Sequence, residues 1–353
     1  MTVFKKKSPR KMPADNPEKK SSVETFAKEY LCQRISPEES FEDLLVFPRY
    51  FEIETVNTCN ARCPMCTIES WTRHSPVMDM GLFTKIADEI GEYAEQVRRV
   101  SLFKDGEPLL DKKLPLRIAL LKESGVENVA IHTNVSLLDE KRGPALLEAG
   151  LDEITLSVDS LKKDVFEEIR EGLNFEVVLE NALRFIELRN RIRPSAEIRM
   201  RMIIQDSNKE EFPEYEAYWS DKLASHDRCF SHNIHNWGGQ LEGHKHVAAS
   251  LQPRVPCVSL WSAMVIFADG DVPMCTVDFH NTHPTGSVVE NSIKELWDSP
   301  VMAERRQIHM EHRRGIFPNC LTCNVWDEPS DFEAFSESYV KQLSVKTGGQ
   351  GAP

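Results

Sequence analysis

Between residues 50 and 234 the sequence alternates between short β-branched or apolar runs and longer segments with helical spacing. The runs with strand character are 50–56, 98–103, 127–134, 152–159, 196–204 and 229–234. The helical segments are 82–97, 113–125, 145–150, 177–192 and 208–223. This alternation predicts an α/β fold with a parallel sheet, and six successive units predict a partial (β/α)6 TIM-like barrel. Active sites in such folds lie at the carboxyl ends of the strands.

The chain divides into four predicted regions. Residues 1–45 form an N-terminal extension, of which residues 1–22 are expected to be disordered and residues 23–45 weakly helical. The barrel occupies residues 46–245, a small α+β domain occupies 246–330, and residues 331–353 form a loose tail. In the small domain, residues 262–275 predict a β-hairpin whose turn is Asp269–Gly270.

Charge and hydropathy narrow the class of protein. The 353 residues carry a formal net charge of −13, which disfavours nucleic acid as a partner, including a tRNA substrate. No apolar run approaches the roughly 20 residues of a membrane-spanning helix, and no signal-peptide hydrophobic segment follows the basic start. We therefore expect a cytoplasmic protein with no membrane partner. Because thiols stay reduced there, the nine cysteines are expected to bind metal or take part in chemistry.

Three cysteines, Cys59, Cys63 and Cys66, follow the first predicted strand directly. A structural zinc site and a fully ligated iron–sulfur cluster both need four ligands. Three thiolates can instead hold three irons of a 4Fe–4S cluster and leave the fourth iron open for a substrate or cofactor. The alternative is zinc, with a fourth ligand such as His74 or a distant cysteine.

A second group, Cys257, Cys275, Cys320 and Cys323, falls in the small domain. Four cysteines suffice for one fully ligated 4Fe–4S cluster. A zinc site is again the alternative, because four cysteines that include a C-x2-C pair also suit zinc.

The segment FEIETVNTCNARCPMC (51–66) resembles the strand and loop that open radical S-adenosylmethionine (SAM) enzymes. The resemblance implies a 4Fe–4S cluster that binds SAM, and a flavodoxin or ferredoxin-type reductant. In that family, cleavage of SAM yields a 5′-deoxyadenosyl radical that abstracts a hydrogen atom from the substrate. The family usually has an aromatic residue before the third cysteine; here Met65 replaces it, and its thioether can pack on adenine.

Further segments carry the same resemblance. Gly106, Glu107 and Pro108 match the last three residues of the family's Gly-Gly-Glu-Pro motif, which binds the SAM amino group, and Asp105 replaces the first glycine. An ammonium group needs acceptors, and glycine permits close backbone approach. Asn134 belongs to a segment resembling the family's Thr-Asn-Gly, with Val135 in place of the glycine.

The fourth predicted strand ends in polar residues that resemble SAM contacts. The resemblance makes Ser157 and Asp159 candidates for binding the ribose or the methionine carboxylate. Arg170 is a candidate partner of that carboxylate. The alternatives are that Ser157, Asp159 and Asn134 only cap loops and that Arg170 is an exposed helix charge.

The small domain resembles the SPASM auxiliary-cluster domain, in its shortened "twitch" form with four cysteines. A fully ligated auxiliary cluster suits electron relay in a net two-electron oxidation, or a structural role. Cys229, at the sixth strand, is a candidate hydrogen-atom donor, with a buried packing cysteine as the alternative. The nearby histidines are expected to line the cavity or the surface: His226, His232, His235, His244 and His246.

These features predict a radical SAM oxidoreductase that oxidises a small polar substrate, such as a sugar or aminocyclitol alcohol, with the auxiliary 4Fe–4S cluster taking the second electron. One alternative is a maturase that crosslinks, epimerises or oxidises a ribosomal peptide or protein. Another is a zinc-stabilised, non-catalytic binding protein, which would show no SAM cleavage and no iron absorbance.

Overall fold

The computed structural model describes residues 17–73, 77–240 and 255–323, with side chains from residue 24 onward. Its centre is a seven-stranded sheet in the order β6-β5-β4-β3-β2-β1-β7, and every neighbouring pair is parallel. The strands are β1 (Tyr50–Ile53), β2 (Arg99–Ser101), β3 (Val129–Thr133), β4 (Glu153–Ser157), β5 (Glu197–Ile204), β6 (Arg228–Asn233) and β7 (Ala263–Ile266). The predicted α/β class is confirmed. The sheet is a partial barrel, because β6 and β7 remain separate edges within the described residues.

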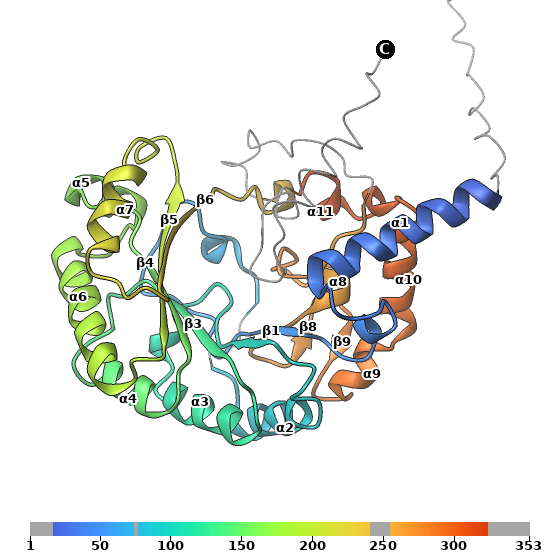
Figure 1. The fold of residues 1–353 in the computed structure, drawn as a ribbon, viewed down its shortest axis with the longest axis horizontal. Coiled ribbons are helices and arrows are strands. Elements are labelled where there is room, and N and C mark those ends of the chain that lie inside the picture. The colour runs from blue at the N-terminus through green and yellow to red at the C-terminus, as the bar shows by residue number, and fades with distance from the viewer. Residues whose placement is uncertain (1–16, 74–76, 241–254, 324–353) are drawn as a thin grey trace, which may run out of the picture.

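Helices cover the outer side of the curved sheet, where α2, α3, α4 and α6 follow one another along its convex face (Figure 1). The helices of the barrel are α2 (Met80–Gly91), α3 (Leu114–Glu123), α4 (Arg142–Glu148), α5 (Lys163–Ile169), α6 (Phe175–Ile192) and α7 (Phe212–Ser220). The helices on the C-terminal side are α8 (Ser259–Ser262), α9 (Ile293–Trp297), α10 (Pro300–Met310) and α11 (Pro318–Leu321). The short 3-10 turns are η1 (Asp43–Leu45), η2 (Ile68–Ser70), η3 (Pro108–Leu110), η4 (Trp237–Gly239) and η6 (Arg314–Ile316).

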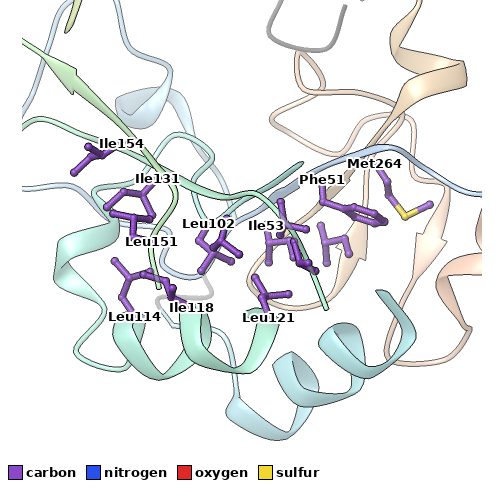
Figure 2. Close-up of a cluster of buried hydrophobic side chains, with 14 of the residues drawn as sticks. Phe51, Ile53, Leu102, Leu114, Ile118, Leu121, Ile131, Leu151, Ile154 and Met264 are labelled. Carbon is purple, nitrogen blue, oxygen red and sulfur yellow. The ribbon is translucent and has the colours of Figure 1, made fainter. Parts of the chain in front are cut away.

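The core lies between these helices and the sheet, and α3 shows how the sequence builds it. Leu114, Ile118 and Leu121 recur at helical spacing on one face of α3, and all three are buried. Figure 2 shows them pointing toward Leu102 and Ile131, which come from the end of β2 and from β3. β3 is buried along its whole length, as is typical of a central parallel strand, and its first three residues are apolar.

The hairpin predicted at residues 262–275 is confirmed at its turn, where the Phe267 N–H also donates to the Asp271 carbonyl (2.9 Å), but its two arms belong to different sheets. Its first half, β7, pairs in parallel with β1 and extends the barrel sheet. The turn itself is present, since the Gly270 N–H donates to the Phe267 carbonyl (2.9 Å) and Gly270 has a φ of +92°. Its second half, β8 (Asp271–Val272), pairs antiparallel with β9 (Gly286–Ser287). The pairing of β7 with β1 covers a buried strand that would otherwise be an open sheet edge.

The N-terminal extension contains a helix, α1 (Pro17–Ile35), so the disorder expected for residues 17–22 is not observed. Tyr30 and Leu31 on this helix are buried in the core. Residues 1–16, 241–254 and 324–353 lie outside the described residues, so the predicted domain limits at 245/246 and 330/331 stay predictions. No helix in the described part of the chain is both long and apolar enough to cross a membrane.

Candidate active site and auxiliary cysteine site

A cavity lies where the sequence predicts the site, at the carboxyl ends of the barrel strands. Its wall contains all three clustered cysteines, Cys59, Cys63 and Cys66. The other predicted site residues in the wall are Met65, Gly106, Glu107, Asn134, Ser157 and Arg170. The fold therefore brings together the loops after β1, β2, β3 and β4 and the end of α5. Pro108 does not line the cavity, and it begins the short turn η3 behind Glu107.

Several N–H groups of the protein point at the cysteine sulfurs. The Sγ of Cys59 accepts from the Ala61 N–H (3.4 Å) and from Asn134 Nδ2 (3.7 Å). The Sγ of Cys63 accepts from Arg170 Nη1 (3.8 Å). Such donors stabilise negative charge on sulfur, as a thiolate ligand of iron carries.

The chemistry of these thiols suits a bound metal centre. Burial, and then the charge of Asp105, raise the pKa of the Cys66 thiol to about 12, so this thiol becomes a thiolate only where a bound metal compensates its charge. Within the described residues, no three Cys, His, Asp or Glu side chains lie close enough to share one metal ion. A 4Fe–4S cluster is larger than one zinc ion and separates its ligands further. His74, the alternative zinc ligand, lies outside the described residues.

Glu107 is held rigidly at the floor of the cavity. Its carboxylate accepts from the Asn134 N–H (2.8 Å), the Thr133 hydroxyl (2.8 Å) and the Leu109 N–H (3.1 Å). Burial outweighs these hydrogen bonds and raises the pKa of Glu107 to about 7. The neighbouring Gly106 is needed for close packing, because a Cβ there would overlap the Val56 carbonyl oxygen. Glu107 is therefore a buried acceptor at a fixed position.

Two departures from the family motifs have physical explanations. Asp105, in the place of a glycine, forms a buried ion pair with Lys104 (2.6 Å). Val135, also in the place of a glycine, has a φ of +69°, the left-handed conformation that glycine adopts without strain. Asn181 Nδ2 supports this turn by donating to the Val135 carbonyl (3.0 Å). The backbone thus keeps the conformation of the motif although the residue differs.

Arg170 is not an exposed helix charge. Its Nε donates to Asp159 Oδ2 (2.6 Å), and its Nη2 is buried with no hydrogen-bond partner among the described residues. Asp159 is fully buried, accepts also from the Ile203 N–H (2.8 Å), and does not line the cavity. The structure therefore makes Asp159 the residue that positions Arg170, rather than a direct SAM contact. The unpaired Nη2 leaves one donor for an anionic group in the cavity.

Spacing did not identify several residues of the cavity wall. Ser157 accepts from Arg201 Nη2 (2.8 Å), and Arg201 lies on β5. Phe103 and His132 stack with their ring centroids 4.8 Å apart. All four line the cavity, and only Ser157 is among the predicted site residues. The signal available in the sequence was position: each lies in, or just beyond, the carboxyl half of a predicted strand.

The turn η4 connects the cavity with the C-terminal cysteines. Trp237 lines the cavity and its Nε1 donates to the Met65 carbonyl (3.2 Å). Trp237, Gly238 and Gly239 all have positive φ, and a Cβ at Gly238 would overlap the Asn319 carbonyl oxygen, next to Cys320. This turn therefore packs against both cysteine regions.

The structure does not support Cys229 as a hydrogen-atom donor at the cavity. Within parallel pairs, aligned residues point to the same face, and Cys229 is aligned with Met200 whereas Phe230 is aligned with the cavity residue Arg201. Cys229 consequently faces α7, where Glu216 acts on its thiol, and it does not line the cavity. It is a packing cysteine, so we do not retain it as a hydrogen-atom donor.

The histidines near β6 separate into groups. His232 and His235 line the cavity, as expected. His226 does not line the cavity. Its Nε2 lies 3.7 Å from Asp227 Oδ1, and Asp227 also forms a buried ion pair with Arg189. His244 and His246 lie outside the described residues.

The four C-terminal cysteines form one neighbourhood. Burial, and then the nearby thiol of Cys257, raise the pKa of Cys275 to about 12. Burial, and then Cys275, Cys257 and Cys323, raise the pKa of the Cys320 thiol. Thiols that act electrostatically on one another in this way lie near one another. Like Cys66, they need a metal to compensate their charge, so this donor set also fits an iron–sulfur cluster.

Comparisons with known proteins agree with these two sites. Residues 53–215 match the Radical SAM superfamily, and residues 257–324 match the iron–sulfur cluster-binding domain called SPASM. The GTP 3′,8-cyclase of Chlorobaculum tepidum is 30% identical over 168 residues, 47% of this chain and 48% of that protein. The chain thus spans about half the length of the curated relatives it matches.

Solved structures share the fold. BtrN in complex with AdoMet and 2-DOIA has a TM-score of 0.56 at 20% identity, covering 82% of this chain and 99% of that one. SuiB of Streptococcus suis has a TM-score of 0.58 at 15% identity, covering 79% of this chain and 71% of that one. At these identities the likeness concerns the arrangement of the chain only.

Proposed function

Because the chain belongs to the radical SAM superfamily and carries a SPASM-type iron–sulfur domain, we propose that it oxidises a small polar substrate, such as a sugar or aminocyclitol alcohol, at carbon. The family assigns it SAM, the 4Fe–4S cluster that binds SAM, and further iron–sulfur ligation in the C-terminal part. When bound, these groups supply a 5′-deoxyadenosyl radical that removes a hydrogen atom from the substrate, and an auxiliary cluster that accepts the second electron. A flavodoxin or ferredoxin-type protein is the proposed reductant.

The observation that carries this proposal is the auxiliary site. Cys257, Cys275, Cys320 and Cys323 lie near one another, so we take their four thiolates as the ligands of one cluster. A cluster with four protein ligands has no open iron for a substrate, and such a cluster suits electron transfer. A net two-electron oxidation needs an acceptor of this kind after hydrogen-atom removal.

Different residues of the cavity would bind different groups of SAM and its cluster. Cys59, Cys63 and Cys66 would hold the cluster. Glu107 is the fixed acceptor for the SAM amino group, and Gly106 lets the backbone approach it closely. The unpaired Nη2 of Arg170 suits the carboxylate of SAM.

The adenosine part would lie against the wall of the cavity. Met65 supplies a thioether surface for adenine, and its carbonyl anchors Trp237. Ser157 and Asn134 supply polar contacts near the ribose. The stacked rings of Phe103 and His132 form a further part of this wall.

Metal content is the first test. In protein purified without oxygen, we expect about eight irons per chain in the parent and about four in the Cys59/Cys63/Cys66→Ala triple variant. Only the reduced parent should convert SAM to 5′-deoxyadenosine. Zinc without iron, after anaerobic reconstitution has also failed, would contradict the proposal and favour the zinc-stabilised binding protein.

The substrate class needs its own measurement. Deuterated candidates of three classes (cyclitol or sugar alcohols, GTP and ribosomal peptides) are incubated with the reduced enzyme. Transfer of deuterium into 5′-deoxyadenosine from an alcohol carbon supports the proposal. Transfer from a peptide alone would favour the maturase alternative. Transfer from GTP would mean that this chain shares its substrate with the GTP 3′,8-cyclases it resembles.

We expect SAM affinity to depend on pH through Glu107. Its pKa of about 7 means that the carboxylate is ionised above pH 7 and protonated below it. A protonated carboxyl is a poorer acceptor for an ammonium group. The affinity for SAM should therefore decrease as the pH falls below 7, by up to about tenfold per pH unit. Equilibrium dialysis with labelled SAM on both sides of pH 7 measures this. In Glu107→Gln binding should be weaker and its pH dependence smaller, and equal pH dependence in both proteins would contradict the assignment.

A further inference from the structure

His309 lies in the last turn of α10 and faces the auxiliary cysteines from inside the protein. Its side chain is buried, with the residue 2% exposed. Its Nδ1 accepts from the Cys257 N–H (3.4 Å), and its Nε2 lies 4.0 Å from the Sγ of Cys320. One imidazole therefore contacts two of the four cysteines, which come from segments far apart in the sequence.

The contact with Cys257 determines which ring nitrogen of His309 carries the proton. A backbone N–H can only donate, so Nδ1 must be the acceptor. A neutral imidazole has one acceptor nitrogen and one N–H, which places the proton on Nε2. Nε2–H is the nitrogen that faces the Cys320 sulfur. The geometry thus provides an N–H donor for a thiolate ligand.

Positive charge surrounds the same sulfurs. Arg314 is buried, and its guanidinium interacts electrostatically with Cys257, Cys320 and Cys323. Arg305 is fixed by donating to the Thr285 hydroxyl (2.7 Å) and to the His283 carbonyl (2.9 Å), and it interacts with Cys275 and Cys320. These two guanidinium groups favour added negative charge at the site, whereas burial and the Asp278 carboxylate near Cys275 oppose it.

We propose that His309 tunes the auxiliary cluster, donating an Nε2–H hydrogen bond to the Cys320 thiolate that raises the reduction potential of the cluster. The inference rests on the proposed function, because it assumes that a cluster occupies this site. Reduction adds one electron to the cluster, and part of that charge resides on the ligand sulfurs. A donor at Cys320 therefore stabilises the reduced form more than the oxidised form. His309 would thus make the cluster a better acceptor of the substrate's second electron.

The test uses the Cys59/Cys63/Cys66→Ala triple variant as its background, because only the auxiliary cluster remains there. Redox titration followed by electron paramagnetic resonance gives the potential of that cluster, and iron analysis gives its occupancy. His309→Leu removes the donor and should shift the potential to a more negative value with the iron content unchanged. His309→Gln keeps an amide N–H at a similar reach and should stay closer to the parent. The control is His312→Asn, at an exposed position with positive φ, which asparagine tolerates.

Each outcome decides the question. An unchanged potential in His309→Leu would overturn the inference, and so would loss of iron in both His309 variants, since His309 would then be needed for binding rather than tuning. Should only the leucine variant lose iron, His309→Asn replaces it, because that shorter amide does not reach Cys320. Zinc in place of iron in the triple variant would overturn the proposed function and this inference together. Iron with an unchanged potential would overturn this inference alone.

Discussion

Gly106→Ala is expected to weaken SAM binding by at least about tenfold and to lower the free energy of unfolding by about 1–3 kcal/mol. The physical reason is the space around this residue. An added Cβ would overlap the Val56 carbonyl oxygen and lie 2.9 Å from the Thr58 carbonyl oxygen, both of them backbone atoms leading into the cysteine loop. Either that loop or the Glu107 backbone must move, and both belong to the SAM site.

The measurements are equilibrium dialysis with SAM and chemical denaturation monitored by circular dichroism. Gly315→Ala is the matched control, because its Cβ would meet only the end of the Leu321 side chain at 3.3 Å, which has room to adjust. SAM affinity should be unchanged in the control. Normal SAM affinity in Gly106→Ala would show that the close approach of these backbones is not needed for binding.

Arg170→Gln should lower the free energy of unfolding by about 3–5 kcal/mol, because it leaves the buried Asp159 carboxylate without its charged partner. The same change removes the donor to Cys63 and the buried, unpaired Nη2 of a residue that lines the cavity, so SAM affinity should also fall. Both effects come from one side chain and are measured on the same preparation by denaturation and by SAM binding.

Two further variants separate these effects. Arg184→Gln breaks an i,i+4 pair with the exposed Glu180 and a hydrogen bond to Asn181 Oδ1 (3.0 Å), and should cost only about 1 kcal/mol. The double variant Asp159→Asn/Arg170→Gln removes the unpaired charge and should recover part of the stability but none of the SAM affinity. Full stability in Arg170→Gln alone would mean that the Arg170–Asp159 pair does not support the fold.

Features that depend on local pattern could be predicted well. The strand predicted at 196–204 is observed as β5 (Glu197–Ile204), because Ile198, Met200 and Met202 alternate with charged residues in the two-residue period of a strand. The cysteine loop lies at the mouth of the barrel because the spacing Cys59, Cys63, Cys66 directly follows a strand. The resemblance to the family motifs added Glu107 and Asn134 to the predicted site, and the Asn134 N–H donates to Glu107 in the structure.

Partnerships between segments could not be predicted in the same way. Asp159 was expected to contact SAM, but the chain after α5 brings Arg170 onto it. Cys229 was considered for chemistry, but its register with Met200 turns it away from the cavity. A shift of one residue along a strand reverses the face on which a side chain lies, and strand spacing alone does not contain that information.

Spacing and residue type in the sequence were sufficient to establish the α/β class, the two cysteine groups and the family to which they belong. The pairing of β7 with β1, the contact of Trp237 with Met65 and the contact of His309 with Cys257 and Cys320 required the folded chain. These contacts join segments far apart in the sequence. Their formation depends on which surfaces the whole core brings together, and the burial that drives this is summed over the entire molecule rather than encoded in one segment.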